Sequence, residues 1–452
     1  MRSVAIIGAG ITGLTAAFSL KRRGRPVRVY EATDRVGGVI RSESRDGFLA
    51  EFGPNTILET SPLIGQLVRD AGLQERRLEA DPQSAARYLV RHRRPVPVPA
   101  GLLDFLTTPL FSFRAKLAVL GEPFVRPRRD GAEESIAQFV ERRLDREFLE
   151  RAVDALVAGI YAGDPHALSV AHAFPRLKAL EDDYGSLIKG QLFGARERRR
   201  RGEIARDRAP KFSFDEGLQV LPDALAAQLG DALTLNAAAS RLRRTRDGWE
   251  VATKDGATAE HAAVVFCGTA PTLAELEVEG ASVAEISRIR YAPVASVVLG
   301  FSRRDVAHPC AGFGVLIPRV EGFRILGTIF SSSLFPGRAP DGHLTLTSYV
   351  GGERSPELAG LPAERLYELV VEDLGELLGA RGAPAFRSCA FYPRAIPQYN
   401  VGYGSFKERM AALEAEAPGL FLAGHYRDGV SLGDCIVSGL HVADRVAARL
   451  DA

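Results

Sequence analysis

Short apolar runs and helical spacings of apolar residues alternate near both ends of this 452-residue chain. Residues 4–7 form an apolar run, a glycine-rich turn and a helical pattern follow, and residues 27–30 form a second run. A continuous apolar run at 263–269 is typical of a buried parallel strand, and residues 419–425 predict a strand that meets a glycine. Because these segments are far apart in the sequence, they predict a Rossmann-like α/β domain built from discontinuous pieces.

The middle of the chain follows two other patterns. Helical spacing of apolar residues dominates from residue 91 to about 210 and predicts an all-helical insertion. The same kind of spacing elsewhere predicts an amphipathic helix over 62–80 and a helix near 362–379. Apolar and β-branched residues predict a second sheet of mixed type, with strands at 294–301, 313–317, 323–330 and 343–350.

The expected fold class is therefore α/β combined with α+β, in three units. These are a Rossmann-like domain, a mixed-sheet substrate domain and a helical insertion. Their predicted boundaries are 1–85 with 205–290 and 405–452, then 86–90 with 291–404, and then 91–204.

Composition narrows the class of protein only modestly. Apolar residues make up 46% of the chain and charged residues 25%, which is a globular composition, and a net charge of +2 gives no reason to expect nucleic acid as a partner. The four cysteines lack CxxC spacing and the eight histidines lack metal-ligand spacing, so we expect reduced thiols in an intracellular protein and no metal site. We expect no signal peptide before the first strand, and no apolar window reaches the ~18 residues of a spanning helix.

The glycine-rich turn is the strongest chemical signal in the chain. It reads Gly8-Ala9-Gly10-Ile11-Thr12-Gly13. The first glycine permits a tight turn, the second lets backbone approach a pyrophosphate, and the third lets the helix pack closely on the strand. Glu31 ends the second strand eighteen residues after Gly13, where it can bind a ribose hydroxyl. A bare glycine turn need not hold a nucleotide, but the flanking strands and the acid favour a dinucleotide site.

A second glycine pair follows in the next loop. The segment Arg35-Val36-Gly37-Gly38 lies just after Glu31. Adjacent glycines let backbone press against a ligand, and arginine can neutralise phosphate. This extension resembles the Glu-x-x-x-Arg-x-Gly-Gly motif of amine-oxidase-type flavoenzymes, which favours FAD over NAD as the cofactor.

Four further motifs make the resemblance more specific. They are GIYAGD at 159–164 with Leu168-Ser169 after it, GFG at 312–314, AIPQY at 395–399 and GVSLGDCIVSG at 429–439. Together with the fingerprint they resemble the oxygen-dependent protoporphyrinogen oxidases, FAD enzymes of haem synthesis, essentially from end to end. The fingerprint alone would be shared with amine oxidases and phytoene desaturases.

The resemblance implies FAD contacts in several segments. The glycine turn would hold the pyrophosphate, Glu31 and Ala32 the adenosine ribose, and His425 with the loop after it would close over the isoalloxazine ring. The family usually has valine near position 239, against adenine, and a residue smaller than histidine at position 425. The implied cofactor contacts are Gly8, Ala9, Gly10, Ile11, Thr12, Gly13, Glu31, Ala32, Arg35, Gly38, Val39, Gly53, Pro54, Asn55, Thr56, Ala239, His425, Val430, Ser431 and Leu432.

Substrate contacts follow from the same resemblance. Arg87 matches an arginine that pairs with a propionate of the tetrapyrrole, and a carboxylate in an apolar cleft needs such a charge-assisted partner. Phe313, Gly314, Leu316 and Tyr349 match positions that line the substrate. The alternative for Arg87 is a surface arginine of an edge strand, and for the others it is core residues of the second sheet.

The implied activity is oxidation of protoporphyrinogen IX to protoporphyrin IX, with O2 as acceptor and hydrogen peroxide as product. The hypothesis is hydride transfer from a bridge carbon to flavin N5, three times per porphyrin, without a catalytic side chain. Coproporphyrinogen III is the alternative substrate, although one evident arginine partner favours the substrate with two carboxylates.

More remote alternatives are an amine oxidase, a carotenoid desaturase, or a flavin-free protein that escorts lipidated or hydrophobic partners. Amine oxidases usually place a lysine near flavin N5, and no lysine lies between Lys254 and Lys407. The complete glycine turn and Glu31 argue against a flavin-free protein.

Residues 91–130 combine arginines with leucine and phenylalanine. They predict either a solvated helical cap on the substrate domain or contact with an anionic membrane surface, which the resemblance favours. We therefore expect a cytoplasmic protein, peripheral on the inner face of the cell membrane. The oligomeric state stays open, a homodimer included.

Overall fold

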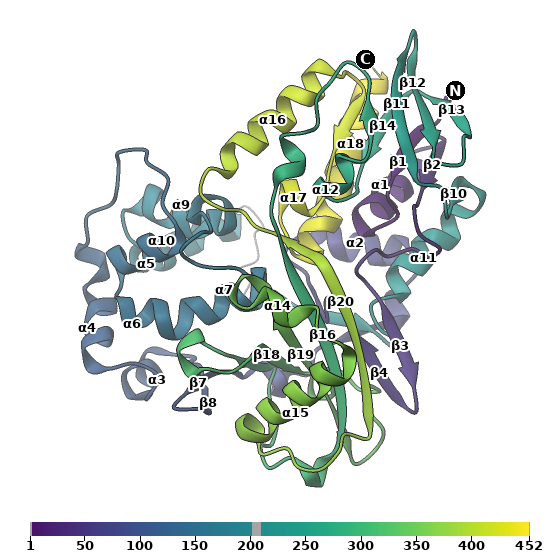
Figure 1. Ribbon diagram of the computed structural model, residues 1–452. Coiled ribbons are helices and arrows are strands. Elements are labelled where there is room, and N and C mark those ends of the chain that lie inside the picture. Colours follow the sequence, from purple (N-terminus) through teal and green to yellow (C-terminus); the bar gives the residue numbers. More distant parts are fainter. Residues whose placement is uncertain (1, 201–208, 452) are drawn as a thin grey trace.

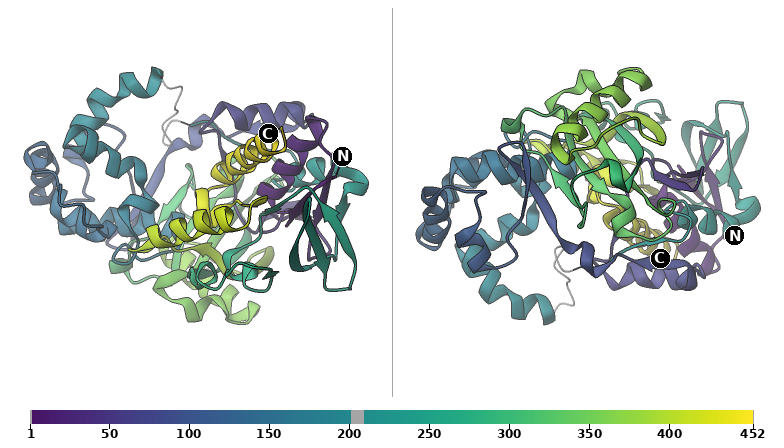
Figure 2. Two further views of the ribbon diagram at one scale, coloured as in Figure 1. Left: turned by 90° about the horizontal axis from the view of Figure 1, so that it is seen from above. Right: turned by 90° about the horizontal axis from the view of Figure 1, so that it is seen from below.

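Three groups of elements form the protein, and Figure 1 shows how they are arranged. The computed structural model describes residues 2–200 and 209–451. Both ends of the chain lie in the group that contains the parallel sheet, and the long strands β16 (Tyr291–Ser302) and β20 (Phe386–Pro397) run away from it. The helices between α3 (Leu102–Thr107) and α10 (Leu187–Arg200) project to one side, as both views of Figure 2 show.

A five-stranded parallel sheet carries the Rossmann-like unit, in the order β10-β2-β1-β14-β21. Its strands are β1 (Val4–Ile7), β2 (Val27–Tyr30), β10 (Leu233–Thr234), β14 (Ala263–Phe266) and β21 (Leu420–Leu422). One hydrophobic core joins this sheet to α1 (Ile11–Arg22), α2 (Pro62–Asp70), α11 (Val220–Leu229) and α18 (Leu432–Asp451). Strands from both ends and the middle of the sequence meet here, which confirms the predicted discontinuous unit.

Smaller sheets and helices extend this unit. They are β3 (Ser42–Arg45) with β4 (Phe48–Glu51); β5 (Ile57–Leu58), β9 (Lys211–Phe214) and β6 (Arg77–Glu79); β13 (Thr258–His261), β12 (Gly248–Thr253), β11 (Ala239–Thr245) and β15 (Glu277–Val278); and α12 (Ala270–Leu273), α16 (Tyr403–Glu416) and α17 (His425–Asp428).

The helix expected over 62–80 is wrong in its length, because α2 ends at Asp70. Gly72 adopts a φ of 76°, which ends the helical path, and Leu73 then turns into the core. The residues that follow form β6, which pairs with β9 from a distant part of the chain. Amphipathic spacing continues through the turn and therefore does not reveal this pairing.

A seven-stranded mixed sheet forms the second group, in the order β20-β16-β19-β18-β17-β7-β8. Its other strands are β7 (Arg87–Arg91), β8 (Arg94–Pro97), β17 (Gly314–Leu316), β18 (Ile325–Phe330) and β19 (His343–Gly351). The short helix α14 (Pro356–Ala359) and the longer α15 (Ala363–Leu378) pack on one face through a common core. The four predicted strands and the helix near 362–379 are confirmed, and β20 is an additional strand.

The prediction of an all-helical insertion from residue 91 is wrong at its start, because β8 pairs with β7 as a hairpin. His92 and Arg93 form the turn at φ 52° and 60°, the conformation that a two-residue hairpin requires. The usual Asn-Gly signal is missing, so the pattern of residues did not indicate a strand.

Helices do predominate from α3 onward in the described part of this region. They are α3, α4 (Phe113–Gly121), α5 (Ile136–Arg143), α6 (Arg146–Phe148), α7 (Asp154–Tyr161), α8 (Val170–Ala173), α9 (Pro175–Tyr184) and α10. Over residues 2–200 and 209–451, no helix has both the length and the apolar composition needed to cross a bilayer.

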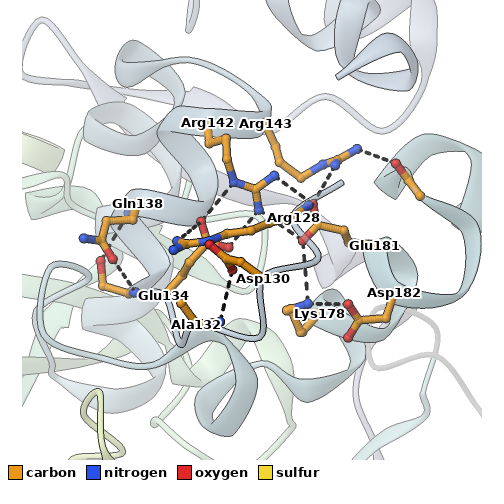
Figure 3. A network of polar contacts seen from close by, with 12 residues as sticks. Arg128, Asp130, Ala132, Glu134, Gln138, Arg142, Arg143, Lys178, Glu181 and Asp182 are labelled. Atoms are coloured by element: carbon orange, nitrogen blue, oxygen red, sulfur yellow. Dashed lines mark hydrogen bonds and ion pairs between the residues drawn. The ribbon is translucent and has the colours of Figure 1, made fainter. Parts of the chain in front are cut away.

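A network of ion pairs links these helices (Figure 3). Arg143, at the end of α5, is fully buried and pairs with Glu122 and Glu181. Arg142 donates to Glu134 and to Glu181, each at 2.8 Å. Glu122 also accepts two backbone N–H groups at the start of α10. The segment that follows α4 is thereby tied to α5, α9 and α10.

Candidate active site

The glycine turn after β1 has the geometry of a phosphate-binding loop. Gly8 has a φ of 102°, and a Cβ on Gly13 would lie 2.0 Å from the Gly8 carbonyl oxygen, so both positions require glycine. By contrast, no described atom comes within 4 Å of a Cβ placed on Gly10. α1 begins at Ile11, directly after this open position, with Thr12 in its first turn. The turn therefore leaves room for a pyrophosphate beside the N–H groups of the helix.

The second glycine pair packs against this turn. The Gly37 N–H donates to the Ala9 carbonyl oxygen at 2.9 Å, and a Cβ on Gly38 would lie 3.5 Å from the Gly10 Cα. The Arg35 guanidinium donates to carbonyl groups of its own loop at 3.0 Å. Arg35 thus shapes the loop, and its contact with a phosphate stays a prediction.

The Glu31 carboxylate is held beside the same turn. It accepts the Ala9 N–H at 2.7 Å and the Thr33 N–H at 2.9 Å. The Ala237 N–H donates to the Glu31 carbonyl oxygen at 2.7 Å, which brings Ala239, the first residue of β11, to this end of the sheet. Three of the predicted contacts in the neighbouring loops are exposed: Ala32, Gly38 and Val39.

Tyr349 on β19 connects the second sheet to the predicted flavin-side segment. Asn55 Nδ2 donates to the Tyr349 hydroxyl at 2.7 Å, and that hydroxyl donates to the Gly53 carbonyl oxygen at 3.1 Å. Ser331 donates to Asn55 Oδ1 at 3.3 Å. Burial raises the pKa of Tyr349, so its hydroxyl remains a donor. Asn55 is buried, and the other members of this segment, Gly53, Pro54 and Thr56, are half-buried.

The C-terminal loop lies beyond the end of β21. His425 begins α17, and its ring packs edge-on against Tyr291, with 5.6 Å between the ring centroids and 87° between the planes. Burial lowers the pKa of His425 to about 4, so the imidazole is neutral at neutral pH. Ser431 Oγ accepts the Asp434 N–H at 3.1 Å at the start of α18. The half-buried residues on either side of Ser431 are Val430 and Leu432.

The predicted substrate residues come together in the second sheet. Gly314 lies in register with Arg87, and Leu316 with Leu89, because β17 and β7 are parallel neighbours. The Arg87 guanidinium lies 5.8 Å from the centroid of the Phe313 ring. This group accounts for four of the five predicted substrate residues.

Register also places Tyr349 on the same sheet face as Leu316. Gly327 on β18 is opposite Leu316 on one side and opposite Tyr349 on the other, and directly paired residues share a face. Helix α7 lies over this face, since a Cβ on Gly159 would be 2.5 Å from Leu316 Cδ2. The hydrogen bonds of Asp154 to the Arg319 N–H and the Arg354 guanidinium fix α7 there.

Glu51 is a buried carboxyl group that the analysis of the sequence missed. It ends β4, two residues before Gly53, and accepts the Ser42 hydroxyl at 2.6 Å and the Leu218 N–H at 2.8 Å. Burial raises the pKa of Glu51 to about 7. No sequence signal marks it, because its burial depends on partners from distant segments.

Other titratable groups supply no obvious nucleophile. Burial raises the pKa of both the Cys267 and the Cys435 thiol, that of Cys435 to about 12, so neither is a thiolate at neutral pH. In the described part of the chain, no group of three or more His, Cys, Asp or Glu side chains could hold a metal ion.

Fold and site together define a class of protein. The open turn at Gly10, the start of α1 and the Glu31 carboxylate lie at the carboxyl ends of parallel strands, where such sheets bind dinucleotides. The second glycine pair and the C-terminal loop add surface that fits FAD. The protein is an oxidoreductase of the FAD-binding class.

Comparisons with known proteins give the family. The chain belongs to the flavin-containing amine oxidoreductases, whose sequence model matches residues 11–447. Protoporphyrinogen oxidase 2, chloroplastic/mitochondrial, of Arabidopsis thaliana is 34% identical, over 100% of this chain and 95% of the relative. Coproporphyrinogen III oxidase of Bacillus subtilis (strain 168) is 28% identical, over 97% and 96% of the two chains. A crystal structure of a protein from Exiguobacterium sp. 255-15 shares the fold, with a TM-score of 0.84, 22% identity and 99% coverage of both chains.

Proposed function

We propose that the protein oxidises protoporphyrinogen IX to protoporphyrin IX in haem biosynthesis, with FAD as cofactor and O2 as final acceptor. Similarity to the Arabidopsis oxidase over the whole chain supports this function. The structural observation that carries the proposal is one sheet face. It bears Arg87, Leu316 and Tyr349, and Tyr349 contacts the segment 53–55 that is predicted to adjoin the flavin.

Arg87 is the group that would bind a propionate of the substrate. It is exposed at the start of β7, and among the described residues no acidic side chain lies within ion-pair distance of it. A guanidinium in this state offers a carboxylate two parallel hydrogen bonds. Phe313 and Leu316 lie beside it and supply apolar surface for the macrocycle.

The surrounding residues bind and orient rather than exchange protons. When bound, FAD supplies the acceptor for a hydride from a bridge carbon of the porphyrinogen. Tyr349 holds the 53–55 segment through its two hydrogen bonds, and α7 covers the face at Leu316 and limits access of water. The aromaticity of the product favours the reaction, so the site needs no strong base.

Coproporphyrinogen III is a second candidate substrate because of one specific observation. Arg91 lies on the same face of β7 as Arg87, since alternate residues of a strand point the same way. Its nearest acid, Glu147, is 3.8 Å away, and two of its guanidinium nitrogens are buried without a partner among the described residues. A second arginine would suit a substrate with more carboxylates.

An amine substrate finds less support. Amine oxidases of this fold usually place a lysine near flavin N5. The strands of the seven-stranded sheet contain no lysine. This sheet therefore offers no counterpart of that residue.

The role of Arg87 is tested with matched variants. We expect Arg87→Ala to raise the KM for protoporphyrinogen about tenfold or more, with kcat changed much less, because binding is lost in ground and transition states alike. Arg87→Lys should recover only part of the affinity, since an ammonium group cannot form the bidentate pair. Arg45→Ala removes an exposed arginine that also lies over a phenylalanine ring, and it should leave KM unchanged. An unchanged KM in Arg87→Ala would remove Arg87 from the site.

We further propose that α3 and α4 contact a membrane surface from the cytoplasmic side. Exposed apolar side chains gather on and beside these helices: Leu103 is 78% exposed, Phe113 76% and Phe124 87%. Arg114 stands among them, with 91% of its side chain exposed. Apolar side chains beside cations are suited to an anionic lipid interface.

A further inference from the structure

Glu51 is a buried carboxyl group that has no part in the proposed activity. It ends β4 and is paired in register with Ser42, the first residue of β3. Its two oxygens accept the Ser42 hydroxyl at 2.6 Å and the Leu218 N–H at 2.8 Å. Gly217 permits this close approach, because it has a φ of 92° and a Cβ there would lie 2.8 Å from Glu51 Oε1. The carboxyl group thus joins β4 to two other segments of the chain.

Those two segments support the loop that carries the second glycine pair. The Gln219 N–H donates to Ser42 Oγ at 3.1 Å, and a Cβ on Gly37 would lie 3.2 Å from Gln219 Oε1. The Gly37 N–H in turn donates to the Ala9 carbonyl oxygen in the glycine turn. A path of contacts therefore leads from Glu51, through Ser42, Gln219 and Gly37, to the phosphate-binding loop.

A second path runs forward along the chain from Glu51. Two residues later, the Gly53 carbonyl oxygen accepts the Tyr349 hydroxyl at 3.1 Å. A Cβ on Gly53 would lie 2.1 Å from the Val39 carbonyl oxygen, so the turn after β4 also packs on the loop of the second glycine pair. Glu51 is thus fixed between two backbone segments that are predicted to adjoin FAD.

We propose that Glu51 is a positioning residue for the cofactor: as a neutral carboxyl group, it holds the loop 37–42 and the turn 53–55 in the arrangement that binds FAD. It acts through these segments, and the proposal requires no contact between Glu51 and FAD. The inference rests on FAD binding and does not depend on which porphyrinogen is oxidised.

The surroundings of Glu51 explain why the neutral form is the one that holds these segments. Burial raises the pKa of Glu51 to about 7, and the charge of Arg338 offsets only part of this effect. Within the described chain Arg338 forms no ion pair with Glu51, and its guanidinium donates instead to Ser213 Oγ and to the Phe214 carbonyl oxygen, both at 2.9 Å. An ionised Glu51 would therefore draw water or Arg338 towards it and disturb the contacts around it. The other charged or titratable groups on the elements packed around Glu51 are Arg41 and Glu43, which pair with each other, Asp215 and Glu216, which pair with Arg76, and Tyr349.

The test measures the FAD affinity of the purified holoenzyme at two pH values. In the wild type we expect the FAD dissociation constant, measured by the flavin fluorescence released on dilution, to rise about tenfold from pH 6 to pH 8.5, because Glu51 must then take up a proton for FAD to bind. Glu51→Gln keeps an acceptor for the Leu218 N–H and a donor to Ser42 but cannot ionise. Its dissociation constant should match that of the wild type at pH 6 and stay nearly constant up to pH 8.5.

A second variant removes the hydrogen bonds themselves. Glu51→Leu should raise the FAD dissociation constant at pH 6 about tenfold or more, the loss typical of one or two hydrogen bonds. Asp373→Leu is the matched control, because Asp373 is also a buried carboxyl group and accepts the N–H groups of Arg324 and Ile325, but in the second sheet group. The control should lower the thermal unfolding temperature in excess FAD and leave the FAD dissociation constant unchanged.

Two kinds of result would overturn the proposal. An unchanged FAD dissociation constant in Glu51→Leu, together with a lower unfolding temperature, would make Glu51 a packing residue. If Glu51→Leu does not fold, Glu51→Gln decides: a wild-type dissociation constant that does not change with pH, or one that changes equally in Glu51→Gln, would contradict the role of the neutral carboxyl group. None of these readouts requires turnover, so failure here is distinct from failure of the proposed activity.

Discussion

At the residue scale, Tyr349 joins two parts of the candidate site that sequence reasoning assigned separately. Tyr349 matched a substrate position, and Asn55 matched a cofactor position. They are 294 residues apart in the chain, and their side chains are joined by a hydrogen bond of 2.7 Å. Only the folded structure brings these positions together, so the contact could not be predicted from either motif.

Glu51 makes the stability of the protein depend on pH. Its pKa in the folded protein is about 7, above the ordinary 4.5. Between these two values the folded protein holds a proton that the unfolded chain has released. The free energy of unfolding therefore falls as pH rises through this window, by up to about 3 kcal/mol.

The variant Glu51→Gln should remove this dependence. We expect chemical denaturation at pH 5 and pH 7.5 to show a smaller loss of stability in the variant than in the wild type. Glu250→Gln is the control, since the pairing with Arg243 lowers the pKa of Glu250 and moves its titration below this window. An equal loss of stability in wild type and Glu51→Gln would contradict the account.

Whether the role of a residue could be predicted depends on how far away in the sequence its partners lie. The roles of Gly8 and Gly13 could be predicted, because a tight turn and a close helix are local requirements. Glu51 could not, because its two hydrogen-bond donors come from β3 and from the segment before α11. Arg35 is intermediate: its loop was recognised, but its bonds to carbonyl groups of that loop were not expected.

At the element scale, α3 and α4 allow a direct test of membrane contact. We expect the double variant Leu103→Ser with Phe113→Ser to lower the fraction bound to vesicles with anionic lipid by roughly tenfold, since two large apolar side chains no longer enter the interface. Binding of the wild type should weaken as salt is added, because the cations beside these helices are screened.

The matched control uses α10, where Leu192 and Phe193 are 70% and 69% exposed. The double variant Leu192→Ser with Phe193→Ser should bind nearly as well as the wild type. Two results would exclude α3 and α4 as the specific contact. One is a vesicle-bound fraction that does not change with lipid charge or salt, and the other is an equal loss of binding in both double variants.

The buried ion pairs of the helical region make a second prediction at this scale. Arg143→Met would remove the arginine that pairs with the buried Glu122 carboxylate. Glu181 would still be paired with Arg142. We expect a loss of about 3–5 kcal/mol in the free energy of unfolding, measured by denaturant titration. Arg146→Met removes an exposed arginine of the next helix and should have little effect. Similar stabilities of the two variants would show that the network is not stabilising.

Errors of prediction among the elements share one cause. Residues 62–80 kept a helix-like spacing, and residues 91–97 were included in a region predicted as helical. Each contains a strand that depends on a distant partner or an unusual turn. The hairpin at His92 depends on two positive φ angles that its residues rarely adopt. Long apolar runs such as 263–269 were predicted correctly, because burial on both faces leaves a continuous pattern.

At the scale of the whole molecule, the order of segments along the chain differs from their order in space. The Rossmann-like unit takes strands from both ends of the sequence, and the second sheet takes β7 and β8 from one part and the five consecutive strands β16 to β20 from another. The discontinuous architecture was predicted, and the full-length match to known relatives agrees with it. The expected boundary near 204 lies outside the described residues. How α7 sits over the sheet required the structure, because it depends on contacts such as that of Gly159 with Leu316.

The central claim is that this chain oxidises a porphyrinogen with bound FAD, and oxygen uptake tests it most directly. The protein is purified anaerobically, its visible spectrum is recorded, and protoporphyrinogen IX and coproporphyrinogen III are then supplied separately. We predict a yellow protein with a flavin spectrum that consumes O2 much faster with protoporphyrinogen IX. The reverse preference would keep the chemistry and make coproporphyrinogen III the substrate. A yellow protein that consumes no O2 with either porphyrinogen would contradict the account.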